Sequence, residues 1–224
     1  MFYKGLRGHY HGGLFLMIRA AVILDGGNSR VLAREAGKRY VPTYIEEIAK
    51  ACIAADEHLL RVLYYDCAPY NGTVRLPVSG RDKEFTASDG WLTDLARRDL
   101  FAVRRGVLKF RGFRPRRIPV NTGQLADADF KPVFEQKGVD MRMGLDIALF
   151  SDKQIVDRII LASQDTDCIP AMKHARRAGL QIVLIRFPNS QIAPELLEHV
   201  DFARDVAWPA GHDDGGDQEE ADDE

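Results

Sequence analysis

The sequence predicts an α/β protein, a three-layer α/β/α sandwich around a mainly parallel sheet. Short uninterrupted apolar runs such as Ala20–Leu24 and Ile159–Ala162 are typical of strands buried on both faces of a parallel sheet. Stretches with helical apolar spacing alternate with these runs, as the β-α units of a parallel sheet require. The chain has 224 residues, of which 46% are hydrophobic and 29% charged, enough for one ordinary domain with its own core.

The first half of the chain begins with the strand that ends at Asp25, where Gly26 and Gly27 indicate a sharp turn. Pro42 suits the first turn of the helix that follows. Alternating apolar residues predict the last strand of this half, which residues 111–121 continue as a ribbon or a loop. After the first strand we expect a helix over 41–59, a strand over Leu60–Tyr65, a loop over 71–81, a helix over Phe85–Arg98 and a strand over Phe101–Phe110.

The second half is predicted to alternate more regularly between helix and strand. Gly179 marks the end of one helix, whose acidic residues lie at its amino-terminal end. In order, we expect a polar connection over 122–136, an amphipathic helix after Asp140, the strand Ile159–Ala162, a helix over Asp165–Gly179, a strand over Leu180–Phe187, a short helix over 194–200 and a last strand over 201–206.

Charge is divided unevenly along the chain. The segment from Ala210 onward holds eight acidic residues and no Lys or Arg, which leaves residues 1–209 with 25 acidic and 31 basic residues, a net charge of +6. A basic body suggests a polyanionic partner. We therefore predict a flexible extension over 1–17, one domain over 18–207 and a disordered acidic tail over 208–224.

Cysteine use and apolar run length predict the compartment. Cys52, Cys67 and Cys168 are odd in number and widely spaced, which suits a reducing environment. No apolar run is long enough to span a membrane, and Arg19 interrupts the run that resembles a signal peptide near the start. These features predict a cytoplasmic protein without a membrane partner.

Acidic residues follow the predicted strands and open the predicted helices. Asp25 ends the first strand, Asp140 begins a helix, and Asp165 and Asp167 follow the strand Ile159–Ala162. Each has a simpler explanation when taken alone, since Asp25 suits a turn and Asp140 suits a helix cap. If the strands are neighbours, however, these carboxylates converge. Their mutual repulsion would then destabilise the fold unless a cation neutralised the negative charges. Oxygen ligands alone indicate a hard ion such as Mg²⁺ or Mn²⁺.

A basic and aromatic stretch lies between Arg97 and Arg117. Cations for phosphates and aromatic rings for bases are the combination that binds single-stranded nucleic acid. Lysine and arginine also protect exposed sheet edges, so a solvated edge strand is the alternative. The stretch interleaves its cations with Phe101, Phe110 and Phe113. The cations predicted to contact RNA are Arg104, Arg105, Lys109, Arg111, Arg114, Arg116 and Arg117.

Three motifs resemble one known family. ILDGGN, KGVD followed by Asp146, and SQDTDCIPAMKHARRAG are together similar to the NYN domain in its LabA-like branch, and the loop YYDCAPYNG is similar too. The resemblance covers about residues 19–206. It implies membership of the PIN-like nuclease superfamily, whose α/β/α fold carries an acidic pocket that binds Mg²⁺ or Mn²⁺ and cleaves RNA.

The resemblance also implies roles for individual residues. By position, the metal ligands are Asp25, Asp140, Asp165 and Asp167, and Asn28 joins them as a catalytic residue. Asp146, Ser163 and Lys137 are predicted to support this pocket. Two positions depart from the family pattern, since Cys168 replaces a common aromatic residue and Gln164 replaces a common glycine.

The sequence therefore predicts a metal-dependent ribonuclease that cuts single-stranded or structured RNA internally. A non-cleaving RNA-binding or regulatory module is the alternative, because a family resemblance does not establish turnover. A phosphatase of the haloacid dehalogenase type would need D-x-D at the first strand, where Asp25 is followed by two glycines. Self-association of the chain is left open.

Overall fold

The computed structural model describes residues 17–120 and 123–211. In chain order, its elements are β1 (Ile18–Asp25), α1 (Gly26–Glu35), α2 (Pro42–Ala51), β2 (Glu57–Cys67), β3 (Gly72–Arg75), β4 (Asp82–Phe85), α3 (Gly90–Ala96), β5 (Phe101–Pro115), the 3₁₀ helix Asp127–Asp129, β6 (Phe130–Lys137), α4 (Val139–Asp152), β7 (Arg158–Ala162), the 3₁₀ helix Thr166–Cys168, α5 (Ile169–Arg177), β8 (Gln181–Arg186), α6 (Pro194–Leu197) and β9 (Phe202–Asp205).

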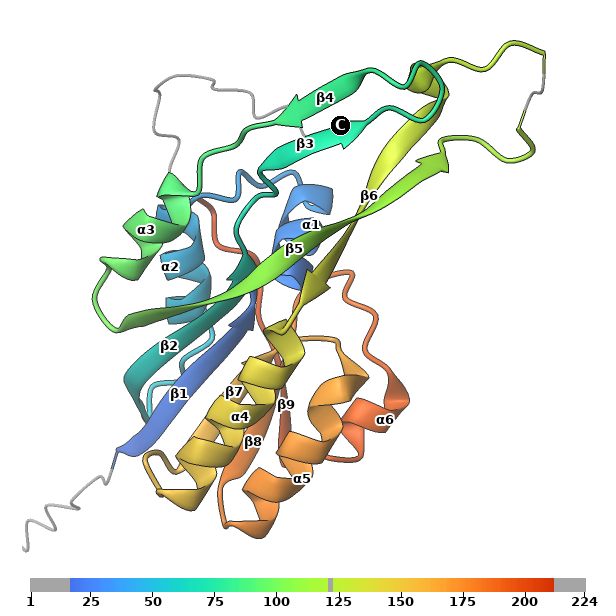
Figure 1. The fold of residues 1–224 in the computed structure, drawn as a ribbon. Coiled ribbons are helices and arrows are strands. Elements are labelled where there is room, and N and C mark those ends of the chain that lie inside the picture. The colour runs from blue at the N-terminus through green and yellow to red at the C-terminus, as the bar shows by residue number, and fades with distance from the viewer. Residues whose placement is uncertain (1–16, 121–122, 212–224) are drawn as a thin grey trace, which may run out of the picture.

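The described residues form a seven-stranded sheet in the order β6-β5-β2-β1-β7-β8-β9 (Figure 1). Every neighbouring pair is parallel except β5 with β6. Because β1 lies between β2 and β7, the carboxyl ends of these three strands meet at one edge, the place where parallel sheets bind ligands. The predicted α/β fold with a mainly parallel sheet is confirmed.

Helices cover both faces of the sheet, and β1 supplies side chains to each face. Ala20, Val22 and Leu24 pack into the core beneath α1, α2 and α3. Ala21 and Ile23 point the other way, into the core beneath α4, α5 and α6. All five side chains are fully buried, which explains why the sequence of this strand is apolar without alternation.

The segment predicted as a loop over 71–81 contains strand β3, which pairs with β4 as a separate antiparallel hairpin. The helix predicted from Phe85 is also wrong at its start, because α3 begins at Gly90. Phe85 instead ends β4, where its ring packs edge-on against Tyr70 and Phe134. This aromatic packing overrides a helical spacing that is only local.

The predicted polar connection over 122–136 is wrong, since it contains most of β6. Phe130, Pro132 and Phe134 occupy alternate positions of this strand, and Phe134 lies opposite Phe110 of β5. Alternation of this kind marks a half-buried strand. Pro132 is tolerated because β6 is the edge strand of the sheet.

Two further elements differ from prediction. The helix predicted over 41–59 ends at Ala51, because Glu57 begins β2 and is buried there. Helix α1 is an element that the sequence does not predict, since Gly26 and Gly27 are poor helix formers. It begins because the Asp25 side chain caps it and accepts a hydrogen bond from the Asn28 N–H.

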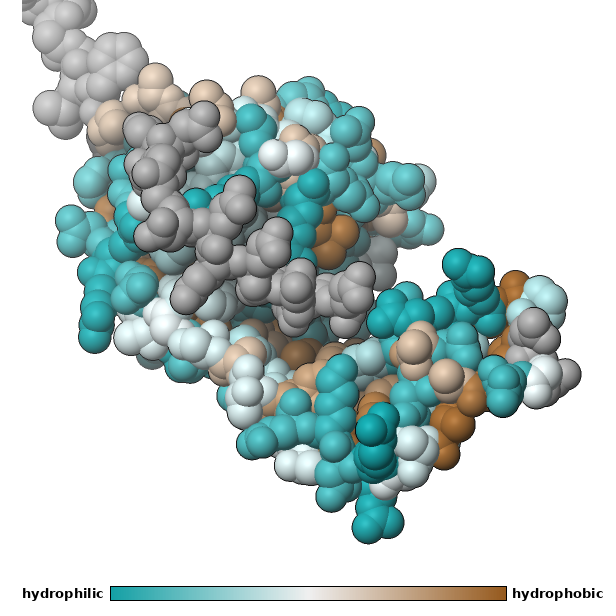
Figure 2. All heavy atoms as spheres, turned by 90° about the horizontal axis from the view of Figure 1, so that it is seen from above, coloured by the Kyte–Doolittle hydropathy of each residue, from teal (hydrophilic) through white to brown (hydrophobic). Residues whose placement is uncertain are grey.

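The outer half of β5 and β6 projects from the body beside the β3–β4 hairpin (Figure 1). Rings of Tyr70, Phe85, Phe110 and Phe134 join the hairpin to these strands, with centroids 5.3–6.1 Å apart. In Figure 2 the projection is mainly hydrophilic, with hydrophobic side chains gathered near its outer end. The projection therefore combines an aromatic base with a polar surface.

The carboxyl-terminal end of the described chain packs on the body. The Trp208 ring stacks on Phe187 with centroids 4.2 Å apart, and Tyr44 donates a hydrogen bond to the Pro209 carbonyl. Most of the predicted extension over 1–17 and most of the predicted tail over 208–224 lie outside the described residues. Across the described ranges, no helix is both long and apolar enough to cross a membrane.

Candidate metal centre

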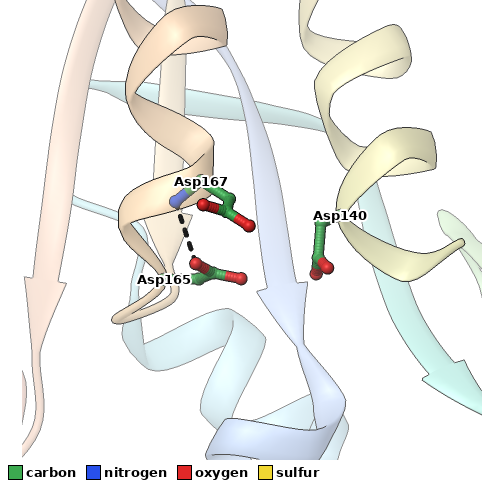
Figure 3. Close-up of side chains that lie close together, drawn as sticks. All are labelled: Asp140, Asp165 and Asp167. Atoms are coloured by element: carbon green, nitrogen blue, oxygen red, sulfur yellow. Dashed lines mark hydrogen bonds between the residues drawn. The ribbon is translucent and has the colours of Figure 1, made fainter. Parts of the chain in front are cut away.

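Three carboxylates converge at the carboxyl-terminal edge of the sheet. Asp140 comes from the first turn of α4, and Asp165 and Asp167 come from the segment that follows β7 (Figure 3). One oxygen from each of the three lies within 4.8 Å of the other two. Metal–oxygen bonds of about 2.0–2.2 Å let one ion join two oxygens up to about 4.4 Å apart, so small side-chain rotations would bring these carboxylates around one Mg²⁺ or Mn²⁺.

Local backbone structure positions each member of this acidic cluster, which we define as Asp140, Asp165 and Asp167. Gly138 precedes α4 in a left-handed conformation with φ of 78°, which suits glycine and turns the chain from β6 into the helix. Asp140 then lies at the positive end of the helix dipole. Asp165 caps the next turn by accepting a hydrogen bond from the Asp167 N–H at 2.9 Å.

The charges of the cluster oppose one another. Burial raises the pKa of Asp140, and the negative charges of Asp165 and Asp167 raise it further. A divalent cation would relieve this repulsion. The donor set consists entirely of carboxylate oxygen, which fits Mg²⁺ or Mn²⁺ and gives no preference for softer metals. The residues present therefore fit the expected ion.

Asp25 lies at the end of β1 and is held beside this cluster without being one of its three converging carboxylates. Its Oδ1 accepts a hydrogen bond from the Asn28 N–H at 3.1 Å, and its Oδ2 accepts one from the Ser163 hydroxyl at 3.2 Å. Burial raises the pKa of Asp25, these hydrogen bonds oppose the change, and the charges of Asp66 and Asp140 add to it. Asp25 is thus fixed in orientation, and the negative charge of Asp140 in the cluster raises its pKa.

Polar side chains surround the end of β1. The Asn28 side chain donates a hydrogen bond from Nδ2 to Oε1 of Gln164 at 3.2 Å. Gly27 lies against Gln136, whose Nε2 would be 3.0 Å from a Cβ at that position. At Gly26 a Cβ would lie 2.3 Å from the Tyr64 hydroxyl oxygen. Glycine is therefore needed at Gly26, where buried groups approach the backbone closely, whereas at Gly27 the exposed Gln136 side chain could move aside.

Asp146 is not one of the three carboxylates of the acidic cluster and is bound instead to side chains of the sheet. Its Oδ2 accepts hydrogen bonds from the Tyr65 hydroxyl at 2.9 Å and from Arg104 Nε at 2.7 Å. These contacts join α4 to β2 and β5, so Asp146 helps to position the helix that carries Asp140. Lys137, the other charged residue predicted to support the pocket, forms an ion pair with Glu135.

Asp66 is a buried carboxylate whose position in the sequence suggests only a turn cap. It accepts hydrogen bonds from the Tyr64 hydroxyl at 2.9 Å and from the Cys67 N–H at 2.7 Å, and it pairs with Arg30. Its Oδ2 would lie 2.7 Å from a Cβ at Gly26. One signal for it exists in the sequence, because Asp66 follows a buried strand run as Asp25 does.

The predicted RNA-contacting cations divide into two groups. Arg104, Arg105 and Arg111 are paired with Asp146, Asp89 and Glu135, respectively. Among the described residues, the other four have no acidic partner. These four, which we call the unpaired cations, are Lys109, Arg114, Arg116 and Arg117. Phe110 and Phe113 lie among them with ring centroids 5.2 Å apart, whereas Phe101 is buried in the core.

Comparison with known proteins identifies one family. Residues 93–205 match the model of the NYN domain, a range that contains the acidic cluster and Asp146 but not Asp25. The crystal structure of a protein of unknown function from Vibrio parahaemolyticus RIMD 2210633 is similar in fold, with a TM-score of 0.50 and 16% sequence identity over 87% of this chain and 94% of that chain. No curated protein matches the sequence.

Proposed function

The chain belongs to the NYN domain family, and from this premise we propose that it is a metal-dependent ribonuclease that hydrolyses RNA phosphodiester bonds internally. The observation that carries the proposal is the convergence of Asp140, Asp165 and Asp167 at the carboxyl-terminal edge of the sheet. The family is part of the PIN-like nuclease superfamily. The motifs ILDGGN, KGVD and SQDTD support placement in its LabA-like branch.

The acidic cluster would hold Mg²⁺ or Mn²⁺. When bound, the ion supplies charge neutralisation at the phosphate and lowers the pKa of a bound water. Asp140, Asp165 and Asp167 provide its oxygen ligands, and Asp25 is the fourth carboxylate at the same edge of the sheet. Asp146 contributes indirectly, since its hydrogen bonds to Tyr65 and Arg104 hold α4 in place.

Asp25 and Asn28 are suited to orient the reacting groups. The Asp25 carboxylate is fixed by hydrogen bonds to both of its oxygens, so its free lone pairs point in defined directions and can accept from the attacking water. The Asn28 amide uses one donor for Gln164 and keeps a second N–H for a phosphate oxygen. Orientation of this kind lowers the activation barrier of hydrolysis, because the reacting groups no longer lose entropy when they are brought into alignment.

The unpaired cations would bind the RNA backbone. Lys109, Arg114, Arg116 and Arg117 are free to contact phosphates, while Phe110 and Phe113 offer aromatic faces beside them. Stacking of bases on such rings is tolerant of sequence. The projection formed by β5 and β6 therefore supplies affinity for single-stranded RNA, and the acidic edge of the sheet supplies the chemistry.

A cleavage assay with the full chain tests this proposal. Dye-labelled single-stranded and hairpin RNAs are incubated with Mg²⁺, Mn²⁺ or EDTA, beside the variants Asp165→Asn and Asp99→Asn. Asp99 is an exposed carboxylate outside the cluster, so its variant controls for the loss of one negative charge. We expect the wild type and Asp99→Asn to cut RNA only with a divalent ion, and Asp165→Asn to lose at least about a thousandfold in rate, or about 4 kcal/mol.

Two other results would contradict the proposal. A wild type that binds RNA but never cuts it, with either ion, would favour the non-cleaving module. Cutting by Asp165→Asn at the wild-type rate would mean that the acidic cluster is not the active site.

A further inference from the structure

A pocket lies next to Asp25, and of its lining residues only Asn28 is used by the chemistry proposed above. It encloses about 270 Å³ between α1, the segment after β7 and the loop after β8. This volume is below the range of about 300–1,000 Å³ that is typical of sites for drug-sized ligands, so a single small ring system suits it. The lining residues are Asn28, Val31, Leu32, Glu35, Gln164, Asn189 and Gln191.

The pocket shares part of its wall with the acidic site. Asn28 lies in it, and its backbone N–H is bonded to Asp25. Gln164 also lines the pocket. Its neighbours in the sequence are Ser163, which donates a hydrogen bond to Asp25, and Asp165 of the acidic cluster. A ligand in this pocket would therefore lie beside the group that reacts at the cluster.

The lining is rich in carboxamides, and the apolar residues lie to one side of them. Four of the seven lining residues are Asn or Gln, which offer both hydrogen-bond donors and acceptors. Val31, which is 55% exposed, and Leu32 give an apolar surface on α1. Neither lysine nor arginine lines the pocket, so a free phosphate is a poor fit, and the single carboxylate of Glu35 is too little for a metal ion.

One donor in this wall has no partner. Oε1 of Gln164 accepts from Asn28, but Nε2 of Gln164 is buried without a hydrogen-bond partner among the described residues. A buried donor left unpaired costs about 1–3 kcal/mol. A ligand that brings an acceptor into the pocket would remove this cost once the Gln164 amide turned toward it, whereas an apolar ligand would not.

We propose that this pocket binds one nucleobase of the RNA, beside the phosphate that is cut, and thereby gives the protein a base preference. Nucleobases in single-stranded RNA are read by hydrogen bonds to their edges and by contact with their faces, which is what carboxamides beside an apolar surface can provide. The inference rests on the proposed ribonuclease function, because it assigns the pocket to the same RNA.

Asn189 and Gln191 allow a test that spares the fold and the acidic site. Both are exposed in the loop after β8, and neither is bonded to the cluster. Asn189 has φ of 65°, a left-handed conformation that glycine adopts without strain. Asn189→Gly with Gln191→Ala therefore removes two carboxamides at little structural cost. Ser190→Ala is the matched control, since Ser190 lies in the same loop outside the pocket lining.

The binding experiment is done in EDTA, where cleavage is absent. Fluorescence anisotropy measures the affinity of the full chain for dye-labelled hexamers A6, C6, U6 and the alternating hexamer (GU)3. We expect the wild type and Ser190→Ala to prefer one sequence by at least about tenfold, and the double variant to bind all four within about twofold. Equal affinities in the wild type, a preference that survives in the double variant, or failure to bind any RNA would each overturn the inference.

A parallel cleavage assay of the same proteins with Mn²⁺ separates this inference from the proposed function. A base preference that the double variant loses, in a wild type that never cuts, supports the pocket and contradicts the nuclease. Cutting by a wild type whose base preference the double variant keeps supports the nuclease and contradicts the pocket.

Discussion

The guanidinium of Arg158 lies 2.6 Å from the carboxylate of Glu57, which joins β7 to β2 at the end of the sheet opposite the acidic cluster. The Glu57 carboxylate also accepts hydrogen bonds from Arg204 of β9 at 2.7 Å and from the Ala54 N–H at 2.6 Å. The carboxylate is buried, with 4% of the residue exposed. One acidic residue at the start of β2 therefore ties together three strands that are distant in sequence.

Glu57→Gln should destabilise the protein by about 3–5 kcal/mol at neutral pH, because it removes the carboxylate partner of Arg204 and leaves the buried Arg158 with only the exposed Asp56, at 3.9 Å. Urea unfolding, followed by circular dichroism, measures the free energy of unfolding of the variant and the wild type. Asp82→Asn, which breaks an exposed ion pair with Arg75, is the control and should change it by less than about 1 kcal/mol. Equal stability of the Glu57→Gln variant and the wild type would contradict this account.

The difference in unfolding free energy between the wild type and Glu57→Gln should also depend on pH, and it should become smaller as the pH falls. Burial opposes ionisation of Glu57, but hydrogen bonds from Arg204, Ala54 and Arg158 outweigh it and lower its pKa to about 2. A depressed pKa contributes stability that is present above the unfolded value of about 4.3 and is lost as the pH falls toward 2. The gap in unfolding free energy should therefore shrink as the pH is lowered from 5 to 2.

Removing one charge from the acidic cluster should have opposite effects with and without metal. In EDTA, Asp165→Asn should be more stable than the wild type by about 0.5–1 kcal/mol, because it relieves repulsion of Asp140 while an amide oxygen can still cap the Asp167 N–H. With Mn²⁺ at ten times its Kd, the wild type should gain about 1.4 kcal/mol, or about 3–6 °C in Tm. If Mn²⁺ raised the Tm of Asp165→Asn as much as that of the wild type, the acidic cluster would not be the metal site.

Gly26→Ala should be strongly destabilising, although Gly26 lies in helix α1. The added Cβ would meet the Tyr64 ring at 2.4 Å and Asp66 Oδ2 at 2.7 Å, and both groups are buried. We expect a loss of about 2 kcal/mol or more in the free energy of unfolding. Gly144→Ala in α4 is the matched control, since its Cβ would lie 3.9 Å from Ala171 and alanine favours the helix by about 1 kcal/mol. Similar thermal stability of the two variants would refute the argument.

The sequence predicts those parts of the site that follow buried strands. Asp165 and Asp167 come directly after an apolar run, and Asp140 opens an amphipathic helix, so their placement at one edge follows from the parallel sheet. The position of Asp25 beside the cluster, and not within it, depends on hydrogen bonds from Asn28 and Ser163 that no spacing encodes.

Other features depend on contacts between segments far apart in the chain. The sequence of β6 predicts a polar connection because its alternation is short and includes Pro132, and the strand is established only by pairing with β5, which places Phe134 opposite Phe110. The pocket beside Asp25 is not predicted either, since Asn189 and Gln191 lie in a loop without periodicity and come together with Gln164 only in the folded chain. Edge strands and loop-lined pockets are set by tertiary contacts, which override local propensity.

The unpaired cations should dominate RNA binding. Arg116→Ala with Arg117→Ala removes two exposed guanidinium groups that have no acidic partner among the described residues, and should reduce the slope of log affinity against log salt concentration by about 0.7 for each phosphate that the protein no longer neutralises. Lys153→Ala with Arg177→Ala removes the same charge near the opposite end of the sheet and is the matched control. Anisotropy titrations with U6 between 50 and 200 mM KCl, in EDTA, measure both slopes. Equal slopes for the two double variants would show that the basic stretch is a solvated edge and that the RNA follows another path.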